Sequence, residues 1–173
     1  MVVRHAKAEQ SGESDHARRL IPRGRKDAES AGRWLAGEGV VPDHALVSAA
    51  PRARETWESL AAGAGWSVEP DLDGGLYSAE PDTALDLIRR TPPDAAVVVV
   101  VGHNPTMGQL VQLLDDGEGD PAASNAMVRG FPTSAVAVFE YDGVWADLDI
   151  TSARLVACHV GRDQPPTGSA APG

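Results

Sequence analysis

Two arginines and two histidines in this chain stand where strand-like segments end. Arg4 and His5 follow the short apolar segment 2–3 at the start of the chain. Arg52 comes at the end of the stretch 48–52, which follows the apolar segment 45–47, and His103 comes soon after the apolar segment 95–101. In open α/β sheets, ligands gather at the carboxyl ends of the strands. If these three strands are neighbours, two imidazoles and two guanidiniums converge on one spot.

Such a set of side chains is suited to phosphoryl transfer. Arg4 and Arg52 can each hold phosphate oxygens with a planar fork of N–H donors, and their charge stabilises the negative oxygens of the transferring group. The same charge disfavours protonation of His5, so its lone pair stays available for attack on phosphorus. His103 precedes Asn104-Pro105, where a helix can begin, and could donate a hydrogen bond to the phosphoryl group. These residues predict phosphoryl-transfer chemistry in which His5 attacks phosphorus.

The elements that must position these residues alternate between strand and helix. The apolar patterns predict strands at residues 2–3, 45–47, 66–68, 95–101, 135–139, 144–150 and 155–160. They predict helices at residues 22–38, 51–64, 81–90 and 107–114. This alternation predicts an α/β fold, a three-layer α/β/α sandwich with a mainly parallel central sheet. A turn at Asp142-Gly143 predicts a late antiparallel hairpin between segments 135–139 and 144–150.

The ends of the chain carry separate expectations. The opening strand is unusually short, which indicates that either a residue or two before it was lost or the start was trimmed. We expect a single domain over residues 1–160. Residues 161–173 are rich in Pro, Gly, Ser and Ala, and we expect them to form a disordered tail.

Composition excludes several classes of protein. The 173 residues include 15 basic and 25 acidic side chains, a formal net charge of −10, which argues against a nucleic-acid binder and against docking to an anionic membrane. The single cysteine, Cys158, allows no intrachain disulfide. No signal peptide or membrane-spanning run is apparent, so we expect a cytoplasmic protein. The dominance of Arg over Lys, with many Ala and Gly, suggests a GC-rich bacterial genome.

Four motifs occur in an order that resembles the histidine phosphatase (phosphoglycerate mutase-like) superfamily. Arg4-His5-Ala6 resembles its Arg-His-Gly opening, with Ala in place of Gly. The stretch 48–56, SAAPRARET, looks like its second motif, and 101–105, VGHNP, is similar to its late Gly-His motif. Between them, the stretch 15–24 resembles the Asp-x-x-Arg-x-Leu-x-x-x-Gly segment of the small SixA-like branch of phosphohistidine phosphatases.

The resemblance implies roles for particular residues. His5 would be phosphorylated, with Arg4, Arg52 and His103 holding the phosphoryl group, and neither a metal nor another cofactor would take part. Arg18 is a candidate for binding the distal part of the substrate, although a solvated loop arginine is an equal alternative.

The general acid is the open question of the site. Larger family members use a carboxylate in a mid-chain insertion, and the loop with Asp71, Asp73 and Glu80 shows no clear equivalent. Asp15 is a rival candidate because its segment closely follows the first motif.

Three functions remain open on the sequence alone. The leading one is hydrolysis of phosphomonoesters or phosphoproteins, including phosphohistidine, since a short chain with little room for a lid suits a side chain displayed on a protein. A phosphomutase would need covering segments that shield its intermediate from water. A module that binds phosphate or a phosphoprotein with little or no turnover is the third. A cysteine phosphatase is disfavoured, because the arginine required six positions after Cys158 is replaced by Gln164.

Overall fold

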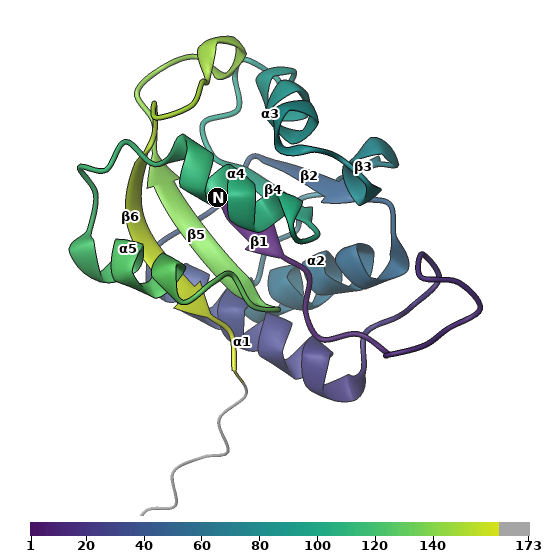
Figure 1. Ribbon diagram of the computed structural model, residues 1–173. Coiled ribbons are helices and arrows are strands. Elements are labelled where there is room, and N and C mark those ends of the chain that lie inside the picture. The colour runs from purple at the N-terminus through teal and green to yellow at the C-terminus, as the bar shows by residue number, and fades with distance from the viewer. Residues whose placement is uncertain (163–173) are drawn as a thin grey trace, which may run out of the picture.

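A computed structural model describes residues 1–162 (Figure 1). The strands are β1 (Val2–Arg4), β2 (His44–Ser48), β3 (Asp71–Asp73), β4 (Val98–Gly102), β5 (Ala135–Glu140) and β6 (Arg154–Val160). The helices are α1 (Pro22–Gly37), α2 (Pro51–Ala64), α3 (Pro81–Arg89), α4 (Thr106–Leu114) and α5 (Pro121–Val128). From residue 163 onward, the expected tail of residues 161–173 lies outside the described residues.

The six strands form one sheet in the order β3-β2-β4-β1-β5-β6. Strands β1 to β4 are parallel, β5 runs antiparallel to β1, and β6 runs antiparallel to β5. Helices α1 and α2 cover one face, and α3, α4 and α5 lie on the other (Figure 1). The predicted α/β sandwich, mainly parallel with antiparallel strands late in the chain, is confirmed.

Strand β4 shows why the sheet is covered on both faces. Val98 and Val100 pack into the core beneath α3, α4 and α5, whereas Val99 and Val101 pack into the core beneath α1 and α2. All four side chains are buried. Since neighbouring strand residues point to opposite faces, an unbroken apolar run requires a layer on each side.

Helices α1 and α2 approach each other closely enough to require glycine at their contact. A Cβ added at Gly32 would overlap the carbonyl oxygen of Leu60, and one added at Gly63 would overlap that of Glu29. This contact fixes the position of α2, whose first turn carries Arg52.

The strand predicted at residues 66–68 is wrong. The edge strand is β3, which lies in the segment expected to be a loop and pairs with β2. The Trp66 indole instead donates a hydrogen bond of 3.0 Å to the Val40 carbonyl and stacks near Trp57. These side-chain contacts hold the segment against the end of α2.

The predicted hairpin has the wrong second strand. Residues 144–150 form a connection with one 3-10 turn, Trp145–Asp147, and β6 is the partner of β5. The Trp145 indole donates a 2.6 Å hydrogen bond to the Ala95 carbonyl, which draws this segment over the core instead of along β5. Helix α5 has no counterpart among the elements expected from the sequence.

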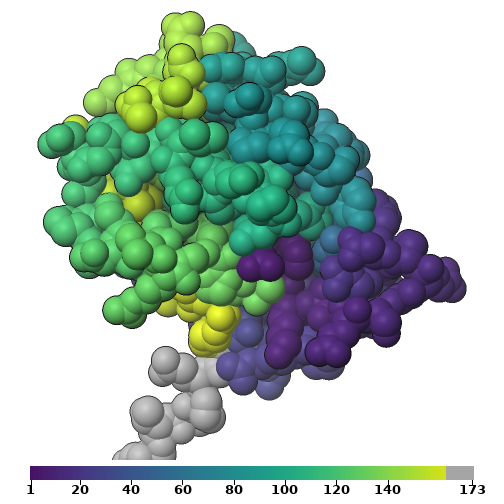
Figure 2. Space-filling view, in the orientation of Figure 1, coloured from purple at the N-terminus to yellow at the C-terminus, as the bar shows by residue number. Residues whose placement is uncertain are grey.

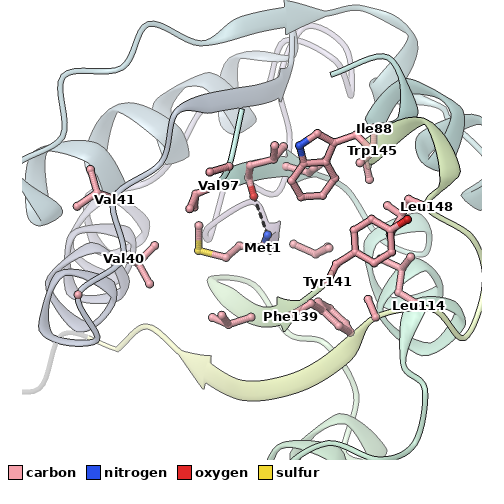
Figure 3. Close-up of a pocket in the computed structure, with 17 residues that line it drawn as sticks. Met1, Val40, Val41, Ile88, Val97, Leu114, Phe139, Tyr141, Trp145 and Leu148 are labelled. Carbon is pink, nitrogen blue, oxygen red and sulfur yellow. Dashed lines mark hydrogen bonds between the residues drawn. The ribbon is translucent and has the colours of Figure 1, made fainter. Parts of the chain in front are cut away.

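An apolar cavity of about 390 Å³ lies at the end of the sheet where β1 begins (Figure 3). The Met1 ammonium is inside it and donates a 2.7 Å hydrogen bond to the Val98 carbonyl. Burial lowers the pKa of this ammonium from 8.0 to about 5. Within residues 1–162, no helix has the length and apolar character needed to cross a membrane.

Candidate active site

The three strand ends singled out in the sequence meet at the opposite end of the sheet. Strand β4 lies between β2 and β1, with Arg4 paired to Gly102 across the β1–β4 ladder. His5 and His103 follow directly, and their ring centroids are 5.0 Å apart. The positive charges of Arg4 and Arg52 act on the His5 ring, so all four predicted residues are brought together.

The hydrogen bonds of His5 define which ring nitrogen is free. Nδ1 lies 2.8 Å from the Ala6 carbonyl oxygen, which can only accept, so Nδ1 carries the proton and Nε2 keeps its lone pair. The Ala6 amide donates to Thr56 Oγ1 at 2.9 Å, and the Thr56 hydroxyl donates to the Arg52 carbonyl at 2.6 Å. The segment after β1 is therefore tied to the first turn of α2.

Both histidine rings are held neutral. Burial lowers the pKa of His5 to about 4, and the nearby Arg52 and Arg4 charges add to this, while the Ala6 hydrogen bond opposes it. Burial likewise lowers the pKa of His103 to about 3, helped by His5 and Arg52. His103 Nε2 is hydrogen-bonded to Ser48 Oγ at 2.8 Å. At neutral pH, His5 is thus an uncharged nitrogen nucleophile.

Several buried donors around His5 lack a partner among the described residues. They are Arg4 Nε and Arg52 Nε, and His103 Nδ1 is a third in the tautomer in which the Ser48 hydroxyl donates to His103 Nε2. Arg4 is anchored through Nη1, which donates to the Phe131 carbonyl at 2.9 Å. Buried polar groups normally have partners, so unmatched donors at one site indicate room for an acceptor. A phosphoryl group, with several acceptor oxygens and negative charge, has the chemistry to fill it.

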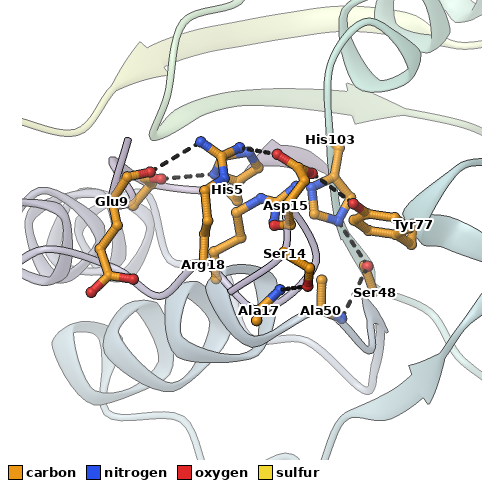
Figure 4. A network of polar contacts seen from close by, with 12 residues as sticks. His5, Glu9, Ser14, Asp15, Ala17, Arg18, Ser48, Ala50, Tyr77 and His103 are labelled. Carbon is orange, nitrogen blue, oxygen red and sulfur yellow. Dashed lines mark hydrogen bonds and ion pairs between the residues drawn. The ribbon is translucent and has the colours of Figure 1, made fainter. Parts of the chain in front are cut away.

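Asp15 lies beside these residues as a paired carboxylate (Figure 4). It accepts from Arg52 Nη2 at 3.0 Å and from the Tyr77 hydroxyl at 2.6 Å, and it forms an ion pair of 2.8 Å with Arg18. The Tyr77 hydrogen bond, followed by the Arg52 and Arg18 charges, lowers the pKa of Asp15. A general acid must hold a proton before it donates one, and this environment favours the ionised form. The assignment of Asp15 as the acid stays a prediction.

Arg18, the other candidate from this loop, lies at the same pocket. Its Nη1 donates to the Glu9 carbonyl at 3.0 Å, and its buried Nε has no partner among the described residues. Its charge also lowers the pKa of His5.

The loop that carries Asp15 and Arg18 is held to α2 by Arg52, which bonds Asp15, and by a second buried group, the Glu55 carboxylate. Glu55 accepts a 2.7 Å hydrogen bond from the Leu20 amide and pairs with Arg19 at 2.6 Å and Arg25 at 3.0 Å. The loop otherwise runs out from the body, as its purple trace in Figures 1 and 2 shows.

Two residues of the site have no role in the sequence-based account. Glu55 and Tyr77 are both in contact with the loop or its carboxylate. Glu55 is inside the second motif, so its position could have drawn attention. Tyr77 lies in a segment predicted only as a loop, and no spacing links it to His103 or Asp15. No cluster of three or more His, Cys, Asp or Glu side chains suited to a metal occurs among residues 1–162.

Comparisons with known proteins identify the family of this chain. The model of the histidine phosphatase superfamily (branch 1) matches residues 1–77. Protein Rv1276c of Mycobacterium tuberculosis is 38% identical over 162 residues, covering 92% of this chain and all of that protein. Phosphohistidine phosphatase SixA of Escherichia coli is 32% identical over 149 residues, covering 82% of this chain and 84% of that protein.

A solved structure assigned to phosphohistidine phosphatase SixA of Nakamurella multipartitia shares the fold. It is 33% identical, has a TM-score of 0.79, and covers 92% of this chain and 93% of its own. The identities and the coverage of whole chains show family membership and not merely a shared fold. The chain belongs to the histidine phosphatase superfamily and, within it, to the SixA-like group.

Proposed function

We propose that this protein removes the phosphoryl group from phosphohistidine on proteins, through a covalent intermediate on His5. The observation that carries the proposal is a neutral His5 with a free Nε2, next to buried donors that lack a partner in residues 1–162. Two relatives named phosphohistidine phosphatases support the choice of substrate.

In the first step, Arg4, Arg52 and His103 bind the oxygens of the phosphoryl group. His5 Nε2 attacks phosphorus, and the bond from phosphorus to the leaving nitrogen breaks. The electron pair stays on that nitrogen, which takes a proton from the solvent and leaves as neutral imidazole. Cationic donors stabilise the charge on the transferring oxygens, and positioning supplies most of the catalysis in such reactions. Arg18 is well placed to contact the substrate beyond the phosphoryl group.

In the second step, water attacks the phosphorus of phosphorylated His5. The Nε2–phosphorus bond breaks, inorganic phosphate is released, and the neutral imidazole is restored. The overall reaction consumes one water, whose hydroxyl group enters the phosphate. Its other proton goes to the solvent and replaces the one that the leaving nitrogen took in the first step.

The protonation states at the site favour a good leaving group. His5 and His103 are neutral, and Asp15 is held as a carboxylate, so these three side chains offer no strong acid. An imidazole leaves phosphorus with less proton assistance than an alkoxide does. This supports phosphohistidine over alkyl phosphomonoesters as substrate.

Trapping the intermediate tests the proposal. Protein incubated with a ³²P-phosphohistidine peptide and quenched without acid should carry label that is stable to base and lost in acid. His5→Ala should carry none, whereas His44→Ala, which changes a histidine on β2, should label like the parent. Acid-stable label, or label that persists in His5→Ala, would refute the mechanism. Phosphate binding without turnover of phosphohistidine or aryl phosphate would indicate a binding module.

A further inference from the structure

Tyr77 lies where two segments meet beside His103 and Asp15. Its hydroxyl donates to Asp15 Oδ2 at 2.6 Å, so it joins the turn before α3 to the protruding loop after β1 (Figure 4). Its ring meets the His103 ring edge-on, with centroids 5.4 Å apart and planes at 80°. The Arg52 guanidinium carbon is 5.5 Å from the centre of the Tyr77 ring.

The hydrogen bonds of Arg52 show what Asp15 does. Arg52 Nη1 donates to the Asp15 backbone carbonyl at 2.7 Å, and Nη2 donates to the Asp15 carboxylate at 3.0 Å. One edge of the guanidinium is thus occupied, and the buried Nε on another edge has no partner within residues 1–162. A guanidinium has five N–H donors in a fixed plane, so gripping one edge orients the other.

We propose that Tyr77 is a positioning residue, which holds the Asp15 carboxylate against Arg52 so that the Nε edge of Arg52 faces the phosphoryl group. The proposal rests on the proposed function, because it assigns Arg52 to the phosphoryl group. Asp15 then acts through Arg52 and serves as an anchor, not as the proton donor.

The exposure of the groups explains why the Asp15–Arg52 ion pair needs further partners, of which Arg18 is one and Tyr77 another. The Arg52 side chain is only 5% exposed, but the Asp15 side chain is 61% exposed and sits on a loop. An ion pair with one exposed partner contributes little and does not fix a geometry by itself. The phenol adds a charge-assisted hydrogen bond from a turn on the other side of the pocket, and that bond limits rotation of the carboxylate.

Tyr77→Phe is the decisive variant, because it keeps the ring and every charge in place and removes only the hydroxyl. Tyr141→Phe is the matched control, since the Tyr141 hydroxyl donates to the Val144 carbonyl and Tyr141 lines the apolar cavity at the other end of the sheet. The chain has two tyrosines, so these two variants together change each of them once.

The binding of inorganic phosphate, followed by calorimetry, gives the first measurement. Tyr77→Phe should weaken it about tenfold, the order expected for loss of a hydrogen bond to a charged group, and Tyr141→Phe should leave it unchanged. On an Asp15→Asn background, the same Tyr77→Phe change should weaken phosphate binding by less than about twofold, because the anchor is already lost. Unchanged phosphate binding in Tyr77→Phe, or equal losses on both backgrounds, would overturn the proposal.

The second measurement is steady-state kinetics with aryl phosphates whose leaving groups differ in pKa. For Tyr77→Phe and for Asp15→Asn, any fall in kcat should be the same for good and poor leaving groups. A fall that grows as the leaving group becomes more basic would show that Asp15 delivers a proton, and would refute the anchoring role. Calorimetry measures phosphate binding and needs no turnover, so it tests the role of Tyr77 independently of the reaction. Failure to trap a phosphoryl group on His5 would refute the proposed function and would leave the test of Tyr77 unaffected.

Discussion

Glu55→Gln should loosen the loop that brings Asp15 and Arg18 to the pocket. The Glu55 carboxylate is buried on α2 and receives the Leu20 amide, Arg19 and Arg25. The substitution keeps the size of the side chain and removes its charge. A neutral amide oxygen accepts hydrogen bonds more weakly, and the new NH₂ group faces donors.

The cost follows from the burial of each partner. The Leu20 amide is buried, so its bond to a charged acceptor contributes about 1.5–2 kcal/mol. Arg25 is 40% exposed, and its pair contributes about 0.5–1 kcal/mol after screening by solvent. The pair with the exposed Arg19 adds little. We therefore expect the free energy of unfolding to fall by about 2–3 kcal/mol.

Urea denaturation of Glu55→Gln measures this cost, with Glu58→Gln as the control. Glu58 lies one turn further along α2 and is exposed, so its change should be under about 0.5 kcal/mol. KM should rise in the Glu55 variant, since the loop carries Arg18 and the Asp15 anchor. Equal stability losses at the two positions, or a Glu55 variant with unchanged stability, would show that the loop is not held as described.

Three further outcomes are expected. Gly32→Ala should lower the free energy of unfolding by about 2 kcal/mol or more because its Cβ would overlap the Leu60 carbonyl, while Gly37→Ala, in open space, should not; urea titration compares them. In a pH–rate profile, kcat/KM, which reports the pKa values of the free enzyme, should fall near pH 4, where His5 protonates, and a midpoint near the ordinary 6.5 would contradict the buried, neutral ring. In a chain that begins at Met1, the ammonium, with a pKa of about 5 folded and 8.0 unfolded, should cost about 3 kcal/mol of stability as pH falls from 8 to 5, because the unfolded chain then binds the extra proton. An N-acetylated chain should lose less stability over the same range.

Helix starts were predictable because their signal is local. Proline occupies the first position of α1, α2 and α3, where its missing N–H costs nothing, and the apolar spacing continues from there. The start of β4 was less predictable from the sequence, since the apolar run begins at Ala95 but the strand begins at Val98. The Asp43 carboxylate accepts the Ala96 and Val97 amides at 2.9 and 2.8 Å, which occupies backbone groups ahead of the ladder.

The late strands show where local signals stop. Asp142-Gly143 is a sequence typical of a hairpin turn. The segment after it nevertheless does not pair with β5, because Trp145 donates a hydrogen bond to the Ala95 carbonyl, 50 residues earlier in the chain. Strand β5 therefore pairs with β6, which follows a longer connection. A choice between two partners of similar apolar character depends on contacts that no local pattern contains.

The residues of the candidate site likewise fall into those that local patterns predict and those that depend on distant contacts. Arg4, His5, Arg52 and His103 could be predicted as a group because parallel strands place their carboxyl ends at one edge. The position of Asp15 depends on the path of a loop, and sequence spacing carries no information about that path. Tyr77 reaches it from 62 residues away, by way of an edge strand that the sequence placed wrongly.

The charges at the pocket explain why an acidic residue belongs there. Arg4, Arg18 and Arg52 all act on His5, and three guanidiniums in so small a space repel one another. Asp15 lies between Arg18 and Arg52, so it offsets that repulsion while both guanidiniums keep a buried Nε unpaired within the described chain. Because the chain has a net charge of −10, one carboxylate more or less changes its total charge little. The effect of Asp15 on the site comes from its position between the two guanidiniums. Removing its charge changes the repulsion and the geometry together, whereas loss of the Tyr77 hydroxyl changes the geometry alone.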